Sequence, residues 1–118
     1  MIIAAVDDMF FASKIRAVAE QLKIDVRFAR NLDSVLSGAH ETRPELVVVD
    51  LQSQKINAIE LAKALKADAD LKDIPLLGFF SHVLADLQQA AIQAGFDRVI
   101  PRSVFSRDLA EILSVNSE

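Results

Sequence analysis

Short apolar runs alternate along the chain with longer segments in which apolar residues recur every three or four positions. The runs predict buried strands at Ile2–Val6, Leu46–Asp50, Pro75–Phe80 and Arg98–Ile100, and the alternating residues of Asp25–Ala29 predict an edge strand. The segments that follow them have the period of amphipathic helices. This alternation is typical of an α/β fold, so the sequence predicts a doubly wound, five-stranded parallel sheet with helices on both faces.

Each predicted helix buries one face. The inner-face residues are Phe10, Ile15, Val18, Ala19 and Leu22 in the first helix, Leu32, Val35, Leu36 and Ala39 in the second, Ile56, Ile59, Ala62 and Leu65 in the third, and Leu109, Ile112 and Leu113 in the last. Asn31 is the expected N-cap of the second helix. The fourth helix is expected to run from about Val83 to a stop at Gly95. Ser103 or Ser106 is the expected N-cap of the last helix.

Composition narrows the class of protein. The 118 residues, 52% hydrophobic and 25% charged, suit one folded domain over residues 1–118. We interpret Phe10, Phe11, Phe28, Phe79, Phe96 and Phe105 as packing residues. A net charge of -4 offers no broad basic surface for phosphates, so direct nucleic-acid binding is not expected. Cysteine is absent, which excludes disulfides and thiolate metal sites.

The first apolar run is too short to be a membrane-targeting or membrane-spanning segment. It reads "MIIAAV" and is interrupted by Asp7 and Asp8. It therefore matches neither a signal peptide nor a membrane span. The sequence predicts a cytoplasmic protein without membrane contact.

Three acidic residues follow strands whose ends are expected to lie together. Asp7 and Asp8 come directly after the first strand, and Asp50 ends the third. In the usual order of such a sheet, 2-1-3-4-5, these two strands are neighbours. Ligands of such folds bind outside the carboxyl ends of the strands. We therefore expect the three carboxylates to converge at a binding edge.

Crowded carboxylates either raise one another's pKa or bind a cation, and oxygen-only ligands favour Mg²⁺. Beside such a metal, Asp50 would be a suitable nucleophile toward phosphorus. Two simpler interpretations stay open. An acid before a helix is often only an N-cap, and Asp50 could simply bond the amides of its own loop.

At these residues the chain resembles the receiver domain of two-component response regulators, the CheY-like family, over essentially its whole length. The resemblance is carried by "AAVDD", "PELVVVDLQ", "DIPLLGFFSH", "AIQAGFDRVI" and "PRSVF". It implies a flavodoxin-like (βα)5 fold with strand order 2-1-3-4-5. It also implies a signalling module rather than an enzyme, whose only reaction is its own phosphorylation.

The resemblance assigns roles to individual residues. Asp50 would be the phosphoacceptor, and Asp7, Asp8, Asp50 and the backbone carbonyl of Gln52 would bind Mg²⁺. A histidine kinase or phosphotransfer protein would supply the phosphoryl group. The surface of the fourth helix, fifth strand and last helix would signal to a protein output partner, and the same surface would be the place for a homodimer.

The sequence departs from the family pattern around the phosphoryl site. Phe80 stands where the family usually has a serine or threonine, although a bulge at Gly78 would bring Ser81 into that place. Arg102 replaces the usual lysine, with a larger, forked cation. Ser103 stands at the usual cis-proline. This makes the chain an atypical receiver.

These departures leave two hypotheses. In the first, Asp50 accepts a phosphoryl group and switches the surface. In the second, the chain is a pseudo-receiver, an interaction module that phosphorylation does not switch; Phe80, Arg102 and Val99, which replaces an aromatic, favour it. Arg102 would then be a structural partner of the acids without any metal. A phosphatase has weaker support, because Gln52 stands where its second acid would be needed.

Overall fold

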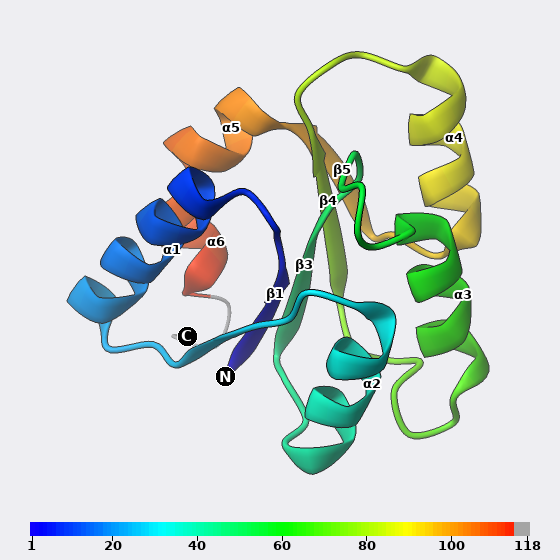
Figure 1. The fold of residues 1–118 in the computed structure, drawn as a ribbon, viewed down its shortest axis with the longest axis horizontal. Helices are drawn as coiled ribbons and strands as arrows, with labels where there is room; N and C mark the ends of the chain where they lie inside the picture. Colours follow the sequence, from blue (N-terminus) through cyan, green and yellow to red (C-terminus); the bar gives the residue numbers. More distant parts are fainter. Residues whose placement is uncertain (115–118) are drawn as a thin grey trace.

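The computed structural model describes residues 1–114 and shows the predicted alternation of strands and helices (Figure 1). Within these residues the elements are β1 (Ile2–Ala5), α1 (Met9–Leu22), β2 (Val26–Phe28), α2 (Leu32–Glu41), β3 (Leu46–Asp50), α3 (Ala58–Ala67), β4 (Leu76–Phe80), α4 (Ala85–Ala94), β5 (Arg98–Pro101), α5 (Arg102–Arg107) and α6 (Leu109–Leu113). The predicted strands are confirmed to within one residue at each end. The fourth helix begins two residues later than its expected start at Val83.

The five strands form one parallel sheet in the order β2-β1-β3-β4-β5. This confirms the predicted fold class and strand order. The ladder between β3 and β4 is regular, with Val49 opposite Gly78 and Asp50 opposite Phe79. Because all strands point the same way, the segments after β1, β3, β4 and β5 emerge at one edge of the sheet, which we call the carboxyl edge.

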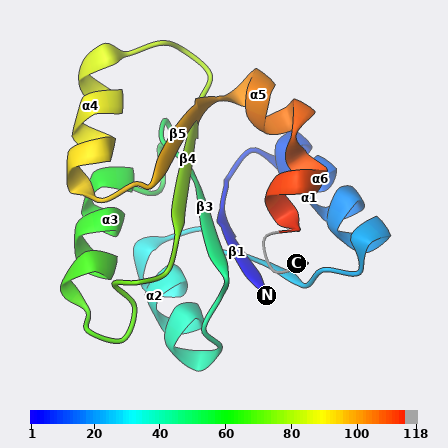
Figure 2. The same cartoon turned by 180° about the vertical axis from the view of Figure 1, so that it is seen from behind.

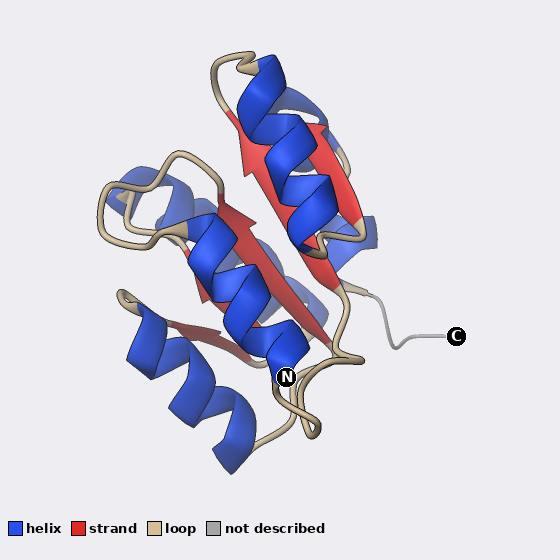
Figure 3. Cartoon of the chain, turned by 90° about the vertical axis from the view of Figure 1, so that its right-hand side faces the viewer, coloured by secondary structure: helices blue, strands red, loops and turns tan. Residues whose placement is uncertain are grey.

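Helices cover both faces of the sheet. α1, α5 and α6 lie on one face and α2, α3 and α4 on the other, as the two opposite views and the side view show (Figures 1, 2 and 3). Alternate strand residues therefore enter two separate cores. Phe79 packs in the core under α1 and α5, and its neighbour Phe80 packs in the core under α2, α3 and α4. Both rings are buried.

Two of the expected helix ends are confirmed. The Asn31 carboxamide oxygen accepts a hydrogen bond from the backbone N–H of Ser34 at 2.8 Å, so Asn31 caps α2. Gly95 ends α4 with a φ of 125°, a conformation that glycine adopts without strain, and its N–H donates to Ala91 and Ile92.

The predicted caps of the last helix are wrong. Ser103 and Ser106 lie inside α5, which begins directly after β5, and neither α5 nor α6 has a side-chain cap. The last helix is also divided in two at Asp108. Ser106 instead accepts a hydrogen bond from Lys14 at 2.6 Å, which links α5 to α1. A serine after a strand looks the same in sequence whether it caps the helix or lies within its first turns.

The interpretation of Phe10 as a packing residue is also wrong, since its side chain is 91% exposed. Its neighbour Phe11 takes the inner position and packs against Phe79 and Phe105, with ring centroids 5.0 and 5.4 Å away. Ile15 and Ala19 are buried as predicted, so the inner face of α1 is otherwise kept, except that Leu22 at its end is 38% exposed. Among the helices of residues 1–114, none combines the length and the apolar character that crossing a lipid bilayer requires.

Candidate functional site

Asp50 ends β3 at the carboxyl edge, where its side chain is half-buried. One carboxylate oxygen, Oδ1, accepts a hydrogen bond from the backbone N–H of Gln52 at 2.9 Å. Burial is the largest influence on this carboxyl and raises its pKa. The Gln52 N–H opposes the shift, and the negative charge of Asp7 adds to it. Asp50 is therefore a carboxylate held in an environment that does not fully stabilise its charge.

Asp8 has a different environment, although it also lies at the carboxyl edge. It is the N-cap of α1, and its Oδ1 accepts hydrogen bonds from the N–H groups of Phe10 and Phe11 at 2.9 and 3.2 Å. Its Oδ2 accepts from Nη2 of Arg102 at 2.9 Å. The Phe11 N–H and then Arg102 hold the pKa of Asp8 below its usual value. The capping interpretation is thus correct for Asp8.

Asp7 is held through a residue that the sequence did not single out. Its Oδ2 accepts a hydrogen bond from the hydroxyl of Ser53 at 3.0 Å. The same hydroxyl oxygen accepts from the N–H groups of Lys55 and Ile56 at 3.2 Å. Ser53 therefore ties the loop after β3 to the loop after β1. In the sequence, only the position of Ser53 three residues after Asp50 indicates that it could link these loops.

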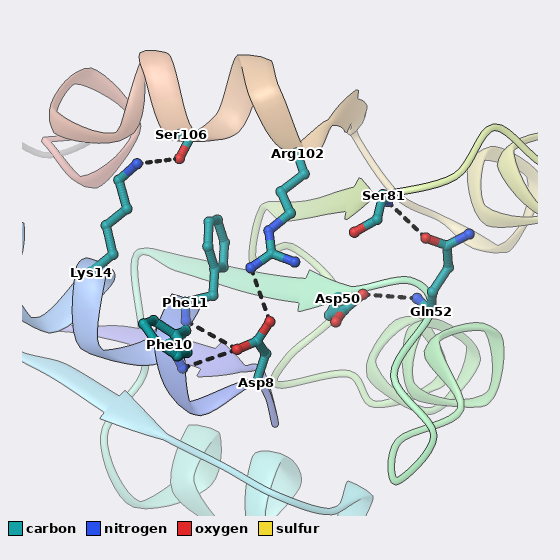
Figure 4. Close-up of polar contacts among 9 residues, drawn as sticks. All are labelled: Asp8, Phe10, Phe11, Lys14, Asp50, Gln52, Ser81, Arg102 and Ser106. Carbon is teal, nitrogen blue, oxygen red and sulfur yellow. Dashed lines mark hydrogen bonds and ion pairs between the residues drawn. The ribbon is translucent and has the colours of Figure 1, made fainter.

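The three acids share one region but do not form a tight cluster. We call Asp7, Asp8 and Asp50 the acidic site. The charges of Asp7, Asp8 and Arg102 all act on the Asp50 carboxyl. Figure 4 shows Asp8, Asp50 and Arg102 facing a common space. Within residues 1–114, however, the one set of three potential ligand atoms that lie within 4.8 Å of one another is elsewhere.

That other set lies at the opposite edge of the sheet, where α2 and α3 end. We call His40, Asp68 and Asp70 the opposite-edge group. Nε2 of His40 and Oδ2 of Asp68 are 2.6 Å apart, and Oδ1 of Asp68 accepts from the N–H of Asp70 at 2.9 Å. The Asp70 N–H and then His40 lower the pKa of Asp68. The Asp68 carboxylate is therefore stabilised within the group.

Arg102 is the first residue of α5 and leans across the acidic site. Its guanidinium carbon lies 4.2 Å from the centroid of the Phe11 ring, in a cation–π contact, while Nη2 bonds Asp8. Beside it, Phe10, Phe11, Lys14, Arg102 and Ser106 line an open hollow of about 280 Å³. Arg102 is thus positioned by one ring and one carboxylate, and Figure 4 shows its side chain reaching down from α5.

The end of β4 contains no bulge. Phe80 is buried and stays in register opposite Pro101. Gly78 serves packing instead, because an added Cβ would lie 2.6 Å from Cδ2 of Leu51. The bulge hypothesis for Gly78 is therefore wrong. Ser81 follows as an exposed residue, and Figure 4 shows its hydroxyl turned to the side on which Arg102 and Asp50 lie.

The side chain of Gln52 makes contacts that the sequence did not suggest. Its Oε1 accepts hydrogen bonds from the backbone N–H groups of Ser81 at 2.7 Å and His82 at 3.1 Å. Its Nε2 donates to the carbonyl oxygen of His82 at 2.9 Å. Gln52 therefore joins the loop after β3 to the loop after β4, while its backbone N–H bonds Asp50.

A family model described as "Response regulator receiver domain" matches residues 2–114. The chain is also similar to the polar-differentiation response regulator DivK of Brucella anthropi, with 28% identity over 75 residues. That match covers 64% of this chain and 61% of DivK, so the chain spans less than two thirds of the relative's length.

Solved structures that superpose on this chain include response regulators. A response regulator from Hahella chejuensis superposes with a TM-score of 0.84 at 19% identity, covering 96% of this chain and 91% of that one. The Mn²⁺-bound form of the response regulator Rcp1 superposes with a TM-score of 0.80 at 18% identity, covering 96% and 91%. At these identities the likeness establishes the fold alone.

Proposed function

The chain belongs to the response regulator receiver domain family, and on this premise we propose that it accepts a phosphoryl group on Asp50 and passes the change to a protein partner. Receiver domains are signalling modules of two-component systems and interact with histidine kinases or phosphotransfer proteins. The observation that carries the proposal is the state of Asp50: a half-buried carboxylate at the carboxyl edge, beside two further acids and an arginine.

In the proposed reaction a carboxylate oxygen of Asp50 attacks the phosphorus of a phosphodonor. A new P–O bond to Asp50 forms, and the bond from phosphorus to the donor's nitrogen or acyl oxygen breaks. The donor group departs with that bonding pair, as imidazole or carboxylate. Arg102 lies close enough to influence the Asp50 charge and would stabilise the phosphoryl oxygens.

The oxygen atoms of the acidic site suit Mg²⁺, a metal that receiver domains typically bind. The acidic site offers only oxygen ligands, and its carboxylates repel one another at Asp50. Asp7, Asp50 and the Gln52 carbonyl would hold the ion, and Asp8, whose two oxygens already accept hydrogen bonds, would act through water. A bound Mg²⁺ would supply positive charge for the phosphoryl oxygens.

The proposed output surface is formed by α4, β5 and α5. It is the surface on which the family resemblance places an output partner or a second copy of the chain. In this chain α4 carries one large exposed apolar side chain, Ile92, which is 54% exposed.

The test is incubation with Mg²⁺ and acetyl phosphate, followed by measurement of the intact mass. We expect wild type to gain one phosphoryl group and Asp50→Asn to gain none. Asp68→Asn is the matched control, because it removes one acid from the opposite edge, and it should be modified like wild type. Equal modification of wild type and Asp50→Asn would contradict the assignment of the phosphoacceptor.

A second candidate, the pseudo-receiver, is favoured by one observation. Phe80 is buried in the core in register at the strand end, so its position supplies no hydroxyl to the site. Arg102 would then hold the acids as a structural ion pair with Asp8. In that case no adduct forms in wild type at any donor concentration, and Arg102→Lys does not produce one.

A further inference from the structure

Within residues 1–114, one side chain hydrogen-bonds the loop after β4 to the loop that follows Asp50. Gln52 stands two residues after Asp50, and its carboxamide makes three hydrogen bonds to the backbone of Ser81 and His82, of 2.7, 3.1 and 2.9 Å. Ser81 and His82 are exposed, so these bonds hold a segment that has little packing of its own.

The same residue contacts the phosphoacceptor directly. The backbone N–H of Gln52 donates to Oδ1 of Asp50 at 2.9 Å. A chemical change at that carboxylate therefore alters the acceptor of the Gln52 N–H, and the side chain of the same residue holds the neighbouring loop. Gln52 therefore contacts Asp50 through its backbone N–H and the loop after β4 through its side chain (Figure 4).

The start of α4 depends on the position of this loop. Val83 and Leu84 are 77% and 51% exposed, and Leu84 is the N-cap of α4 without a side-chain cap bond. Because α4 lacks such a cap, the placement of its first turn depends on the segment before it. At the strand end, Phe80 is buried and cannot hydrogen-bond a phosphoryl group. The Gln52 carboxamide is the polar connection that remains between the two loops in residues 1–114.

We infer that Gln52 is a positioning residue whose side chain couples the state of Asp50 to the segment Ser81–Leu84 and the start of α4. In this chain it replaces the coupling that a hydroxyl at position 80 would provide. The inference rests on the proposed function for the signal at Asp50, whereas the contact between the loops stands independently of it.

The first measurement tests the contact without any phosphoryl chemistry. Amide hydrogen exchange is followed by NMR in wild type and in Gln52→Met, which keeps the side-chain length and removes both polar groups. The Ser81 and His82 amides should exchange about five- to tenfold faster in the variant, as expected for the loss of one hydrogen bond each. Gln52→Glu, which keeps an acceptor oxygen, should restore protection. Unchanged exchange in Gln52→Met would overturn the inference.

The second measurement tests the coupling. Beryllofluoride with Mg²⁺ stands in for the phosphoryl group, and amide resonances are compared at saturation. In wild type we expect residues 51–53 and residues 81–84 to shift together. In Gln52→Met, residues 51–53 should still shift and residues 81–84 should not. Gln54→Met, the same change at an exposed glutamine two residues further on, should behave like wild type.

The outcomes separate the two proposals. If residues 51–53 of wild type shift and residues 81–84 do not, the coupling is wrong and the proposed phosphoacceptor stands. If residues 81–84 still shift in Gln52→Met, the signal reaches them by another route and the inference is wrong. If wild type does not respond at residues 51–53, the proposed function fails, and the coupling fails with it.

Discussion

The acidic site and the opposite-edge group contain similar side chains and differ in how their charges are compensated. In the opposite-edge group, the backbone N–H of Asp70 and then His40 stabilise the Asp68 carboxylate and lower its pKa. In the acidic site, burial and the neighbouring charge of Asp7 raise the pKa of Asp50. The opposite edge therefore has a stabilised carboxylate, Asp68, and the carboxyl edge has a carboxylate, Asp50, whose charge costs free energy.

This difference teaches that the number and proximity of acids do not identify a functional site. The tightest set of potential ligand atoms within residues 1–114 is the opposite-edge group, at the ends of two helices. The acidic site is looser, but it lies at the carboxyl edge of the sheet, where ligands of such folds bind. Uncompensated charge at a binding edge is the stronger indication of function.

Mg²⁺ affinity is expected to separate the two edges most strongly. Asp50→Asn should weaken Mg²⁺ binding at the acidic site by at least about 10- to 100-fold, the range found when even outer-shell partners of a metal are removed. Asp68→Asn should leave the affinity unchanged. Titration calorimetry measures both. A larger loss in Asp68→Asn than in Asp50→Asn would place the cation at the opposite edge.

A glycine substitution beneath the acidic site tests the packing there without changing a charge. Gly78→Ala should lower the free energy of unfolding by about 1–3 kcal/mol, because its Cβ would lie 2.6 Å from Leu51, the residue after Asp50. Gly38→Ala in α2 is the matched control. Its Cβ would lie 3.5 Å from Ile3, an ordinary contact, and it should stabilise the helix by up to about 1 kcal/mol. Urea denaturation measures both changes.

Removing the negative charge of Asp50 should stabilise the folded protein. Because the folded pKa of Asp50 is raised, its effect on stability becomes unfavourable as pH rises from its ordinary value of 3.8 through the folded pKa. Without metal at neutral pH, Asp50→Asn should raise the free energy of unfolding measured by urea denaturation. The gain should disappear below the ordinary pKa. A loss of stability at neutral pH would mean that the Asp50 charge is compensated.

In the opposite-edge group, removing a carboxylate should lower the stability of the protein instead of raising it, and this effect should be the smallest. The folded pKa of Asp68 is depressed, so its contribution is present above its ordinary value of 3.8 and is lost as pH falls through the folded pKa. Asp68→Asn should slightly lower the urea midpoint at neutral pH, and the difference from wild type should vanish in acid. Salt should also reduce it, because the pair with His40 is exposed.

Much of the fold could be predicted because its signals are local. The alternation of apolar runs and helical periods gave the five strands and their helices, and Asn31 and Gly95 marked helix ends by their own chemistry. The errors fall where neighbouring residues compete for one role. Phe10 and Phe11 are both apolar, and only packing against Phe79 and Phe105 decides that Phe11 is inside.

By itself the sequence determined that two acids follow β1 and a third ends β3, at one edge of a parallel sheet. Only the tertiary structure decided what each acid contacts. Arg102 bonds Asp8 across 94 positions of the chain, and Gln52 reaches Ser81 across 29. Periodicity and capping depend on residues a few positions apart, so sequence patterns record them. The partner of a loop side chain depends on how distant loops meet after packing, and no local pattern carries that information.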